Sequence, residues 1–343
     1  MNESEIAKLK TYIEGNQKFV LTCHTNADGD ALGSTLGLRR VLIAIGKEAT
    51  VIVPDLPPSF YSWMPDFKTV KTYERETEVC DTIIDDADCI FVMDYNDLKR
   101  VKSLGEKIAA SNKPTLMIDH HTDPQLKANV CISVPEAPAT CELAYRLCCQ
   151  MGYEDKIDVK AATLFYSGIM TDTGGLSYNS SQPELYLLVA DLLRKGIDKT
   201  TIHNNIFNNK NLRRLKLLGF ALHRKMHRIE KLPLAVMALS KDELERFKYN
   251  TGDTEGFVNY PLQSKDIIAT ALILDRPDCI KISIRSKGDF PVNEFAAEYY
   301  GGGGHINAAG ANCSGDFDEV VKQYEKNIAE FYIRKSLNNI SSK

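Results

Sequence analysis

Short apolar runs alternate with longer helical patterns along the first half of the chain. The runs are rich in β-branched residues and are apolar at successive positions, which is typical of strands covered on both faces in a parallel sheet. Helical patterns such as 31–45 and 141–151 lie between them, and a glycine follows each. This alternation predicts a doubly wound α/β domain with a mostly parallel five-stranded sheet. The predicted strands are 18–22, 49–53, 89–93, 115–118 and 129–134.

The second half begins with a stretch that is helical in pattern from 182 to 230 and includes a long predicted helix over 212–229. After position 232 apolar runs return, which predicts a second, smaller α/β domain that ends in an amphipathic helix over 317–336. We therefore expect a first domain over 1–181, a helical linker over 182–231 and a second domain over 232–336.

Composition places the chain among ordinary globular proteins. It has 343 residues, of which 43% are hydrophobic and 26% charged, and its formal net charge is −4. Any contact with a polyanion must therefore come from a local basic patch. The nine cysteines are scattered without a C-x-x-C pair, so a disulfide framework is not expected. No apolar run approaches the roughly 20 residues that span a bilayer, and the first residues lack the pattern of a signal peptide. We expect a cytoplasmic protein that does not enter a membrane.

Basic residues crowd the segment 210–228 with little acid among them; Arg213, Arg214 and Lys225 are examples. The interpretation we favour is a solvated helix face. The alternative is a surface that binds the phosphate backbone of an oligonucleotide.

Acidic residues and histidines gather directly after the predicted strands. In an open parallel sheet, reactive groups collect in the crevice at the carboxyl ends of the strands, so these side chains should share one edge. Hard carboxylates with a few imidazoles suit manganese or magnesium better than structural zinc. Two such ions, roughly 3.5–4 Å apart, would neutralise the carboxylates and activate a water. The residues that follow predicted strands are His24, Asp28, Asp30, Asp94, Asp119, His120 and His121; Asp172 lies just beyond a predicted helix over 159–170.

A simpler interpretation exists for each of these positions taken singly. An aspartate after a strand is usually a turn residue or a helix cap, and Asp30 alone could cap a helix that starts at Ala31. Four clusters at the same edge of one sheet are not explained in this way, so we favour the metal centre.

A run of four glycines, followed by a histidine, marks the second domain at 301–305. Consecutive glycines let backbone N–H groups approach an anion closely, and we expect this loop to open a helix whose N-terminus would add its positive dipole end. A flexible linker would look similar. The predicted phosphate clamp comprises Gly302, Gly303, Gly304, His305 and Arg285, the last at the end of a predicted strand.

Six motifs, taken together, resemble those of one known family. The segment 24–30 (HTNADGD), Asp94, the triplet 119–121 (DHH) and the segment 171–175 (TDTGG) are similar, in this order, to the four motifs of the DHH phosphoesterase family. The segments 284–286 (IRS) and 301–310 (GGGGHINAAG) resemble its DHH-associated C-terminal domain. The likeness covers nearly the whole chain. The compact two-domain form resembles the bacterial members that degrade short RNA and dephosphorylate pAp.

The resemblance implies manganese-dependent hydrolysis of phosphoesters with two Mn²⁺ ions, for which Mg²⁺ is a possible substitute. Asp119 would orient a histidine, His121 would contact the scissile phosphate and Asn26 would lie close to it. One departure is the segment 176–178 (LSY), where relatives often carry an aromatic residue and then arginine. The implied ligands are His24, Asp28 and Asp94 for one ion and Asp30, Asp94, His120 and Asp172 for the other; the implied substrate-binding residues are Arg285, Gly302, Gly303, Gly304 and His305.

The implied function is hydrolysis of short single-stranded RNA to mononucleotides and of pAp to AMP, by attack of a water that two metals activate, in a homodimer. The nearest alternative is a phosphodiesterase for cyclic di-AMP or pApA that uses the same metal site. Membrane-anchored relatives with that activity carry transmembrane and sensory modules, which this sequence does not contain. A non-catalytic nucleotide sensor is a third possibility, and a missing metal ligand would mark it; none is missing.

Overall fold

The computed structural model describes residues 2–209 and 211–341. The chain divides into two units, Met1–Asn209 and Lys210–Lys343, and each has its own sheet and its own hydrophobic core. In the described part of the chain no helix has the length and apolar character needed to cross a membrane.

The sheet of the first unit is wholly parallel and has six strands in the order β3-β2-β1-β4-β5-β6. This confirms the doubly wound α/β fold class, but the predicted number of five strands is wrong. The additional strand, β3, consists of Lys71 and Thr72 and pairs at the edge with Ile52 and Val53. Two residues, one of them a lysine, give no periodic signal. The strands are β1 Lys18–Thr22, β2 Glu48–Val53, β3 Lys71–Thr72, β4 Cys89–Met93, β5 Thr115–Asp119 and β6 Val130–Ser133.

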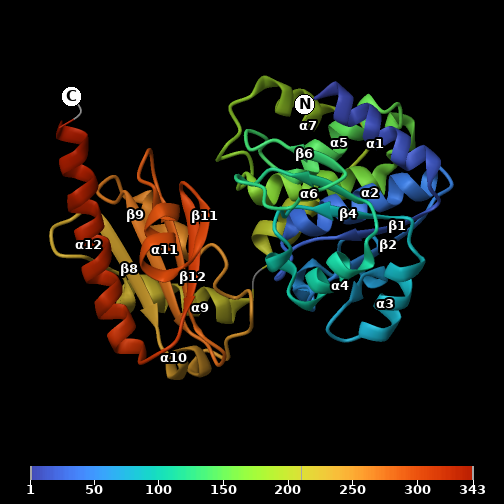
Figure 1. Ribbon diagram of the computed structural model, residues 1–343. Helices are drawn as coiled ribbons and strands as arrows, with labels where there is room; N and C mark the ends of the chain where they lie inside the picture. The colour runs from blue at the N-terminus through green and yellow to red at the C-terminus, as the bar shows by residue number, and fades with distance from the viewer. Residues whose placement is uncertain (1, 210, 342–343) are drawn as a thin grey trace. The chain divides into compact units, whose positions relative to one another are not determined.

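Helices cover both faces of this sheet, as its apolar strands require. Figure 1 shows α1, α2, α5, α6 and α7 on one face and α3 and α4 on the other, and two separate apolar cores fill these layers. The strand order reverses between β1 and β4, and ligands of doubly wound sheets bind at such a switch point. The helices are α1 Glu3–Gly15, α2 Gly29–Ala44, α3 Thr77–Asp86, α4 Ser103–Ser111, α5 Thr140–Gln150, α6 Val159–Asp172, α7 Pro183–Arg194 and α8 Lys199–His203.

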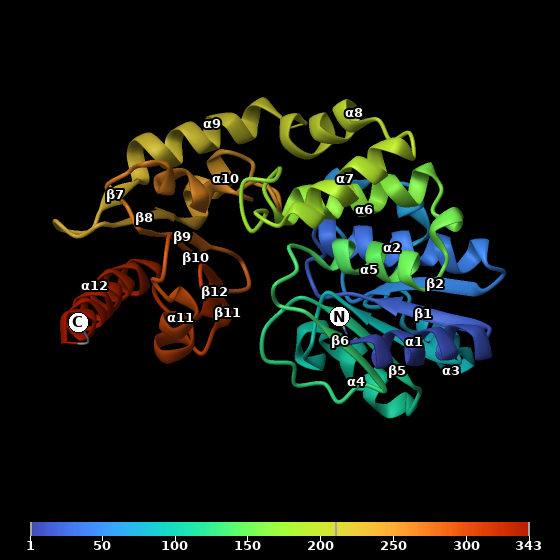
Figure 2. The same ribbon diagram turned by 90° about the horizontal axis from the view of Figure 1, so that it is seen from above.

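The second unit has a mixed sheet in the order β11-β12-β10-β9-β8-β7, in which only β8 and β9 run parallel. Figure 2 shows α11 and α12 against one face and α9 and α10 against the other. The elements are α9 Leu212–Phe220, β7 His227–Arg228, β8 Leu234–Leu239, α10 Lys241–Arg246, β9 Ala269–Asp275, β10 Ile280–Ser286, α11 Val292–Tyr300, β11 Gly303–His305, β12 Ala308–Cys313 and α12 Phe317–Ser341.

Short helical turns complete both units. They are 3-10 turns at Ser59–Tyr61, Phe67–Thr69, Leu98–Val101, Glu154–Lys156 and Phe257–Gln263, and π turns at Asn204–Asn208 and Ala221–Lys225. The helix predicted over 212–229 is helical only as far as Lys225, where a π turn ends it, and the prediction is wrong beyond that point because strand β7 follows.

The basic residues of this segment are mostly engaged within the second unit. Arg213 lies 2.9 Å from a carboxylate oxygen of Asp253, and Lys225 lies 2.8 Å from one of Glu243. The guanidinium of Arg214 packs on the Phe257 ring. These side chains therefore contact the second unit itself, and Arg214, which is buried, does not lie on the solvated helix face that we expected.

Candidate metal centre

The loops that follow β1 and β4 turn sharply, and both turns rest on residues in the left-handed region of backbone space. Asn26 has φ 54° and Asp94 has φ 62°. Asparagine and aspartate enter this region more readily than other residues with a side chain, because their short polar groups bond locally. Asp94 is 2% exposed and begins the loop directly after Met93, the last residue of β4. The turn therefore leaves a carboxylate at the carboxyl end of a central strand.

Asp94 lies between two histidines and presents one carboxylate oxygen to each. Its Oδ2 is 3.3 Å from Nε2 of His24, and its Oδ1 is 3.5 Å from Nε2 of His120. His24 is also 3.8 Å from Oδ2 of Asp28. The other oxygen of Asp28 accepts hydrogen bonds from the first turn of α2, so Asp28 both caps that helix and faces His24. Asp28, and not Asp30, is therefore the N-cap of α2.

A second set of side chains forms around His120. Its Nε2 is 3.3 Å from Oδ2 of Asp172, the last residue of α6, and Asp30 completes a group whose donor atoms all lie within 4.8 Å of one another. His24, Asp28 and Asp94 form another group at the same spacing. The structure thus brings together all six side chains that the sequence nominated as metal ligands.

Within the Asp-His-His triplet, the first residue holds the third by two hydrogen bonds. Asp119, which is fully buried, accepts a hydrogen bond from Nδ1 of His121 at 2.8 Å and another from the His121 backbone N–H at 3.0 Å. These two bonds fix both the backbone and the ring of His121. The ring of His121 therefore has one defined orientation beside Asp94, whose Oδ1 is 3.8 Å away.

The charges in this cluster are strongly coupled. Burial and the neighbouring Asp94 charge raise the pKa of Asp30 to about 7. Burial and the charge of Asp30 likewise raise the pKa of Asp172 well above its usual value. Burial would also raise the pKa of Asp94, but hydrogen bonds from His120 and His24 outweigh it and hold that pKa well below the usual range. Burial would lower the pKa of His24, yet Asp94 raises it to about 9.

This donor set fits divalent cations. His24 and His120 each use Nδ1 to contact a backbone carbonyl, that of Thr25 at 2.8 Å and that of Ala137 at 3.1 Å. This contact holds Nδ1 as a donor and aims Nε2 at the carboxylate oxygens, so that Nε2 can donate to Asp94 in the metal-free protein or offer its lone pair to a cation in place of that proton. Carboxylates whose pKa values rise because they crowd one another supply the negative charge that such a cation would neutralise.

The structure adds supporting residues that sequence reasoning missed. The Asp55 carboxylate accepts the Asn26 backbone N–H at 2.8 Å, and buried Asn96 donates to the Thr122 carbonyl at 2.9 Å, in the loop after the triplet. Thr140 donates its hydroxyl to Asp94. Asp55 follows β2 just as Asp94 follows β4, so the rule that found the other carboxylates applies to it as well. No comparable signal marked Asn96 or Thr140.

The second unit departs from its prediction at the glycine run. The helix expected after this run is absent, because Gly303–His305 forms β11 and pairs with Ala308–Cys313 as an antiparallel hairpin. The anion-binding argument from a helix N-terminus therefore fails there. Ala308 pairs with Arg285 on one side and with His305 on the other, so these two candidate residues flank the same position of β12.

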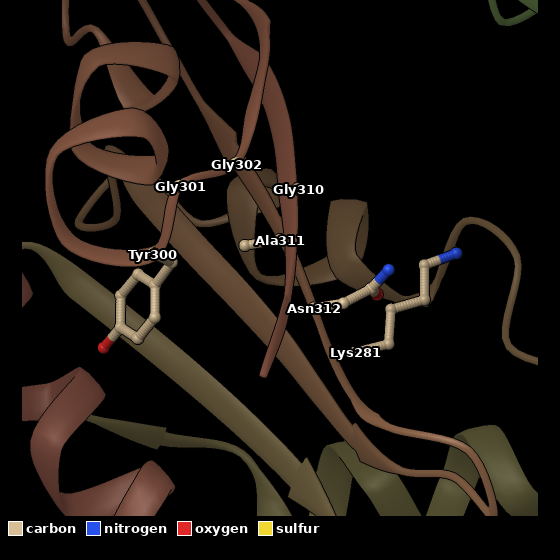
Figure 3. Close-up of a pocket in the computed structure, with 7 residues that line it drawn as sticks. All are labelled: Lys281, Tyr300, Gly301, Gly302, Gly310, Ala311 and Asn312. Carbon is tan, nitrogen blue, oxygen red and sulfur yellow. The ribbon is translucent and has the colours of Figure 1, made fainter. Parts of the chain in front are cut away.

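A hollow of about 420 Å³ lies beside this hairpin. Figure 3 shows the Lys281 and Asn312 side chains close together at one end of it and the Tyr300 ring at the other, with Gly302 and Gly310 between them. Of the predicted clamp only Gly302 lines this hollow. The other predicted members lie on β10 and β11.

Two family models match the chain. Residues 18–169 match the N-terminal domain of the DHH family, and residues 232–330 match the DHHA1 domain. With its doubly wound sheet and its cluster of carboxylates and histidines, the chain belongs to the DHH family of phosphoesterases.

Individual relatives extend over almost its full length. The chain is 27% identical to the bifunctional oligoribonuclease and PAP phosphatase NrnA of Thermus thermophilus, over 95% of this chain and 93% of that protein. Its identity with the NrnA of Bacillus subtilis is 26%, over 85% and 88% of the two chains. A solved structure of an exopolyphosphatase-related protein from Bacteroides fragilis is 40% identical, has a TM-score of 0.92, and aligns with 96% of this chain and 97% of its own.

Proposed function

We propose that this protein is a manganese-dependent phosphoesterase that hydrolyses short single-stranded RNA to mononucleotides and pAp to AMP. The observation that carries this proposal is the position of Asp94 between His24 and His120, with one carboxylate oxygen toward each. A carboxylate placed in this way can be shared by two cations. The similarity to NrnA proteins over nearly the whole chain supports the substrate class.

The residues that would hold the cations fall into two sets around Asp94. His24, Asp28 and Asp94 would hold one ion, and Asp30, His120 and Asp172 would hold the other together with Asp94. Manganese accepts carboxylate oxygens together with imidazole nitrogens, and magnesium is a possible substitute. When bound, the two ions would polarise the phosphate and lower the pKa of a water at neutral pH.

Other residues of the chain would bind and orient the phosphate. His121, with its ring held by Asp119, would contact the scissile phosphate and, as an imidazolium whose Nε2–H donates to an equatorial oxygen, would stabilise the charge that builds there. Asn26, exposed on a loop held by Asp55, would lie at the same phosphate. Arg285 and His305 would bind a more distant phosphate or nucleotide with the glycine-rich hairpin, which includes Gly302, Gly303 and Gly304. We also propose a homodimer in the cytoplasm.

The decisive test is a substrate panel. Purified protein with Mn²⁺ is incubated with pAp, RNA of two to five nucleotides, pApA and cyclic di-AMP, and an Asp94→Ala variant serves as the control. Mononucleotides from RNA and phosphate from pAp, both lost in the variant, are the expected result. Turnover restricted to pApA or cyclic di-AMP would assign the same site to second-messenger breakdown. Binding without turnover would indicate a nucleotide sensor.

A further inference from the structure

The N-terminus of α5 meets two carboxylates of the candidate metal centre. The backbone N–H of Thr140 donates to Oδ2 of Asp30 at 2.6 Å, and that of Cys141 donates to Oδ1 of the same residue at 2.8 Å. The hydroxyl of Thr140 donates to Oδ1 of Asp94 at 3.0 Å. One residue, itself fully buried, thus contacts both acidic side chains.

We propose that Thr140 is a positioning residue for the metal centre. Its hydroxyl holds Asp94, and its backbone amide holds Asp30. This inference rests on the proposed function, because it assigns Thr140 a role toward the ions that Asp30 and Asp94 would bind. Groups that hold metal ligands in this way typically change metal affinity or activity by about 10- to 100-fold when they are removed.

The hydroxyl sets the plane of the Asp94 carboxylate. Oδ1 accepts the Thr140 hydrogen bond and also faces His120, which leaves Oδ2 directed at His24. Without that donor, rotation of the carboxylate about its Cβ–Cγ bond would be less restricted. Because Asp94 lies on a left-handed backbone turn at the end of a strand, its own backbone supplies less support than a regular element would.

Close packing of three helices fixes the position of the donor. A Cβ at Gly168 of α6 would lie 2.7 Å from Oδ1 of Asp30 and would clash with the Cys141 sulfur. No side chain fits between α6, the start of α2 and the start of α5. The Thr140 and Cys141 amides donate to the Asp30 carboxylate at this point of contact. Because the three helices pack closely there, each limits the movement of the other two.

Two substitutions at Thr140 separate the hydroxyl from the shape of the side chain. Thr140→Val keeps the branched shape and removes the hydroxyl, whereas Thr140→Ser keeps the hydroxyl. Thr163→Val is a matched control on α6, because the Thr163 hydroxyl bonds only to the Val159 carbonyl of its own helix. For each protein we would measure a Mn²⁺ binding isotherm by calorimetry, the melting temperature with and without Mn²⁺, and kcat and KM on pAp and an RNA dinucleotide.

We expect Thr140→Val to bind Mn²⁺ about 10- to 100-fold more weakly and to lose kcat at saturating Mn²⁺ with little change in KM. Thr140→Ser should lie within about threefold of the wild type, since the hydrogen bond remains. Thr163→Val should match the wild type in metal binding and turnover. A purely structural role for the hydroxyl would lower the melting temperature of the metal-free protein and leave the Mn²⁺ isotherm unchanged.

The positioning role is overturned if Thr140→Val binds Mn²⁺ as tightly as the wild type, or if Thr140→Ser is as impaired as Thr140→Val. If Thr140→Val does not fold, the comparison of Thr140→Ser with the wild type decides, because a weakened isotherm in a protein that retains the hydroxyl contradicts the proposal. The isotherm does not depend on any substrate. A wild type that binds Mn²⁺ but hydrolyses none of the panel would overturn the proposed function alone.

Discussion

The two units gather their polar residues in different ways. In the first unit, side chains from six separated positions meet because parallel strands end at one edge of a sheet, and helices then close around them. In the second unit, Arg285 and His305 flank one position of an antiparallel sheet, and the glycine run between α11 and β12 becomes an edge hairpin. In a parallel sheet, ligand-binding residues are expected at the carboxyl ends of the strands. The conformation of a glycine run cannot be predicted in this way, because glycine adopts many conformations at similar free energy.

This difference determines how each unit should respond to substitution. A change in the first unit should act through charge and metal affinity with little effect on backbone conformation. A change at the hairpin should act through conformation first.

The strongest test of the first unit is Asp94→Ala. We expect turnover of an RNA dinucleotide to fall by more than about 100-fold, beyond the range for groups that only support a ligand, because Asp94 would contact both ions. Mn²⁺ binding should weaken in parallel, while circular dichroism remains that of the wild type. Asp97→Ala, three residues further on and at the start of a 3-10 turn, is the control. Full Mn²⁺ affinity in Asp94→Ala would refute the shared-ligand role.

For the hairpin, Gly304→Ala and Gly303→Ala form a matched pair. Gly304 has φ 141°, and a Cβ there would press on the Ala308 carbonyl, whereas Gly303 has open space. We expect Gly304→Ala to destabilise the second unit by about 1–3 kcal/mol and Gly303→Ala to be close to neutral. Hydrogen exchange of the β12 amides, together with denaturant unfolding, measures this. Mn²⁺ affinity should be unchanged in both, and equal exchange in the two variants would contradict the conformational explanation.

A smaller effect is expected for Arg285→Ala. Loss of a charge-assisted hydrogen bond to phosphate should raise KM for an RNA dinucleotide by about tenfold, and it should leave kcat and the Mn²⁺ isotherm unchanged. Arg246→Ala, an exposed arginine of the same unit, serves as the control. A change in kcat with constant KM would show that Arg285 takes part in the chemical step and not only in binding.

The smallest effect concerns an ion pair away from the crevice. Arg40 contacts Asp66 and Asp158, and its hydrogen bond lowers the pKa of Asp158. We expect Arg40→Ala to lower the free energy of unfolding of the first unit by about 1 kcal/mol or less, without loss of activity. Since the folded-state pKa of Asp158 is depressed, its contribution is present above the ordinary aspartate pKa and is lost as the pH falls below it.

Denaturation of the wild type and Arg40→Ala at a series of pH values tests this pair. The difference between the two proteins should shrink toward acid pH. Asp158→Asn provides a second check, because asparagine retains the cap of α6 that Asp158 makes with Ala161 while it removes the charge. If the difference in unfolding free energy between the two proteins grew on acidification, it would contradict the lowered pKa of Asp158.

The sequence predicted the doubly wound sheet because buried parallel strands are apolar on both faces, as 89–93 and 115–118 are. Because such strands collect reactive groups at their carboxyl ends, the sequence also placed Asp94 near His24 and His120, whereas Asp172 comes from the end of α6. Sequence reasoning missed β3, since Lys71 and Thr72 pair at an edge without an apolar pattern. It also missed Thr140, because a threonine at the start of a helix looks the same whether or not a carboxylate of another element lies within reach.

The glycine run shows a different limit. Its composition predicted a loop that opens a helix, with a flexible linker as the alternative, and the pairing of Gly303 with Gly310 makes a hairpin instead. Such pairing depends on residues that lie across the sheet and not on the run itself. Long-range partners of this kind leave no periodic signal in the sequence.

The left-handed turns at Asn26 and Asp94 limit how far the protein can be made thermostable. Glycine would relieve the backbone at either position, so a search that selected only for melting temperature would accept it there. The resulting protein would be more stable but would lack the side chains on which the proposed chemistry depends. An engineering programme should therefore hold these two positions fixed and look for stability on the helical faces of the sheet.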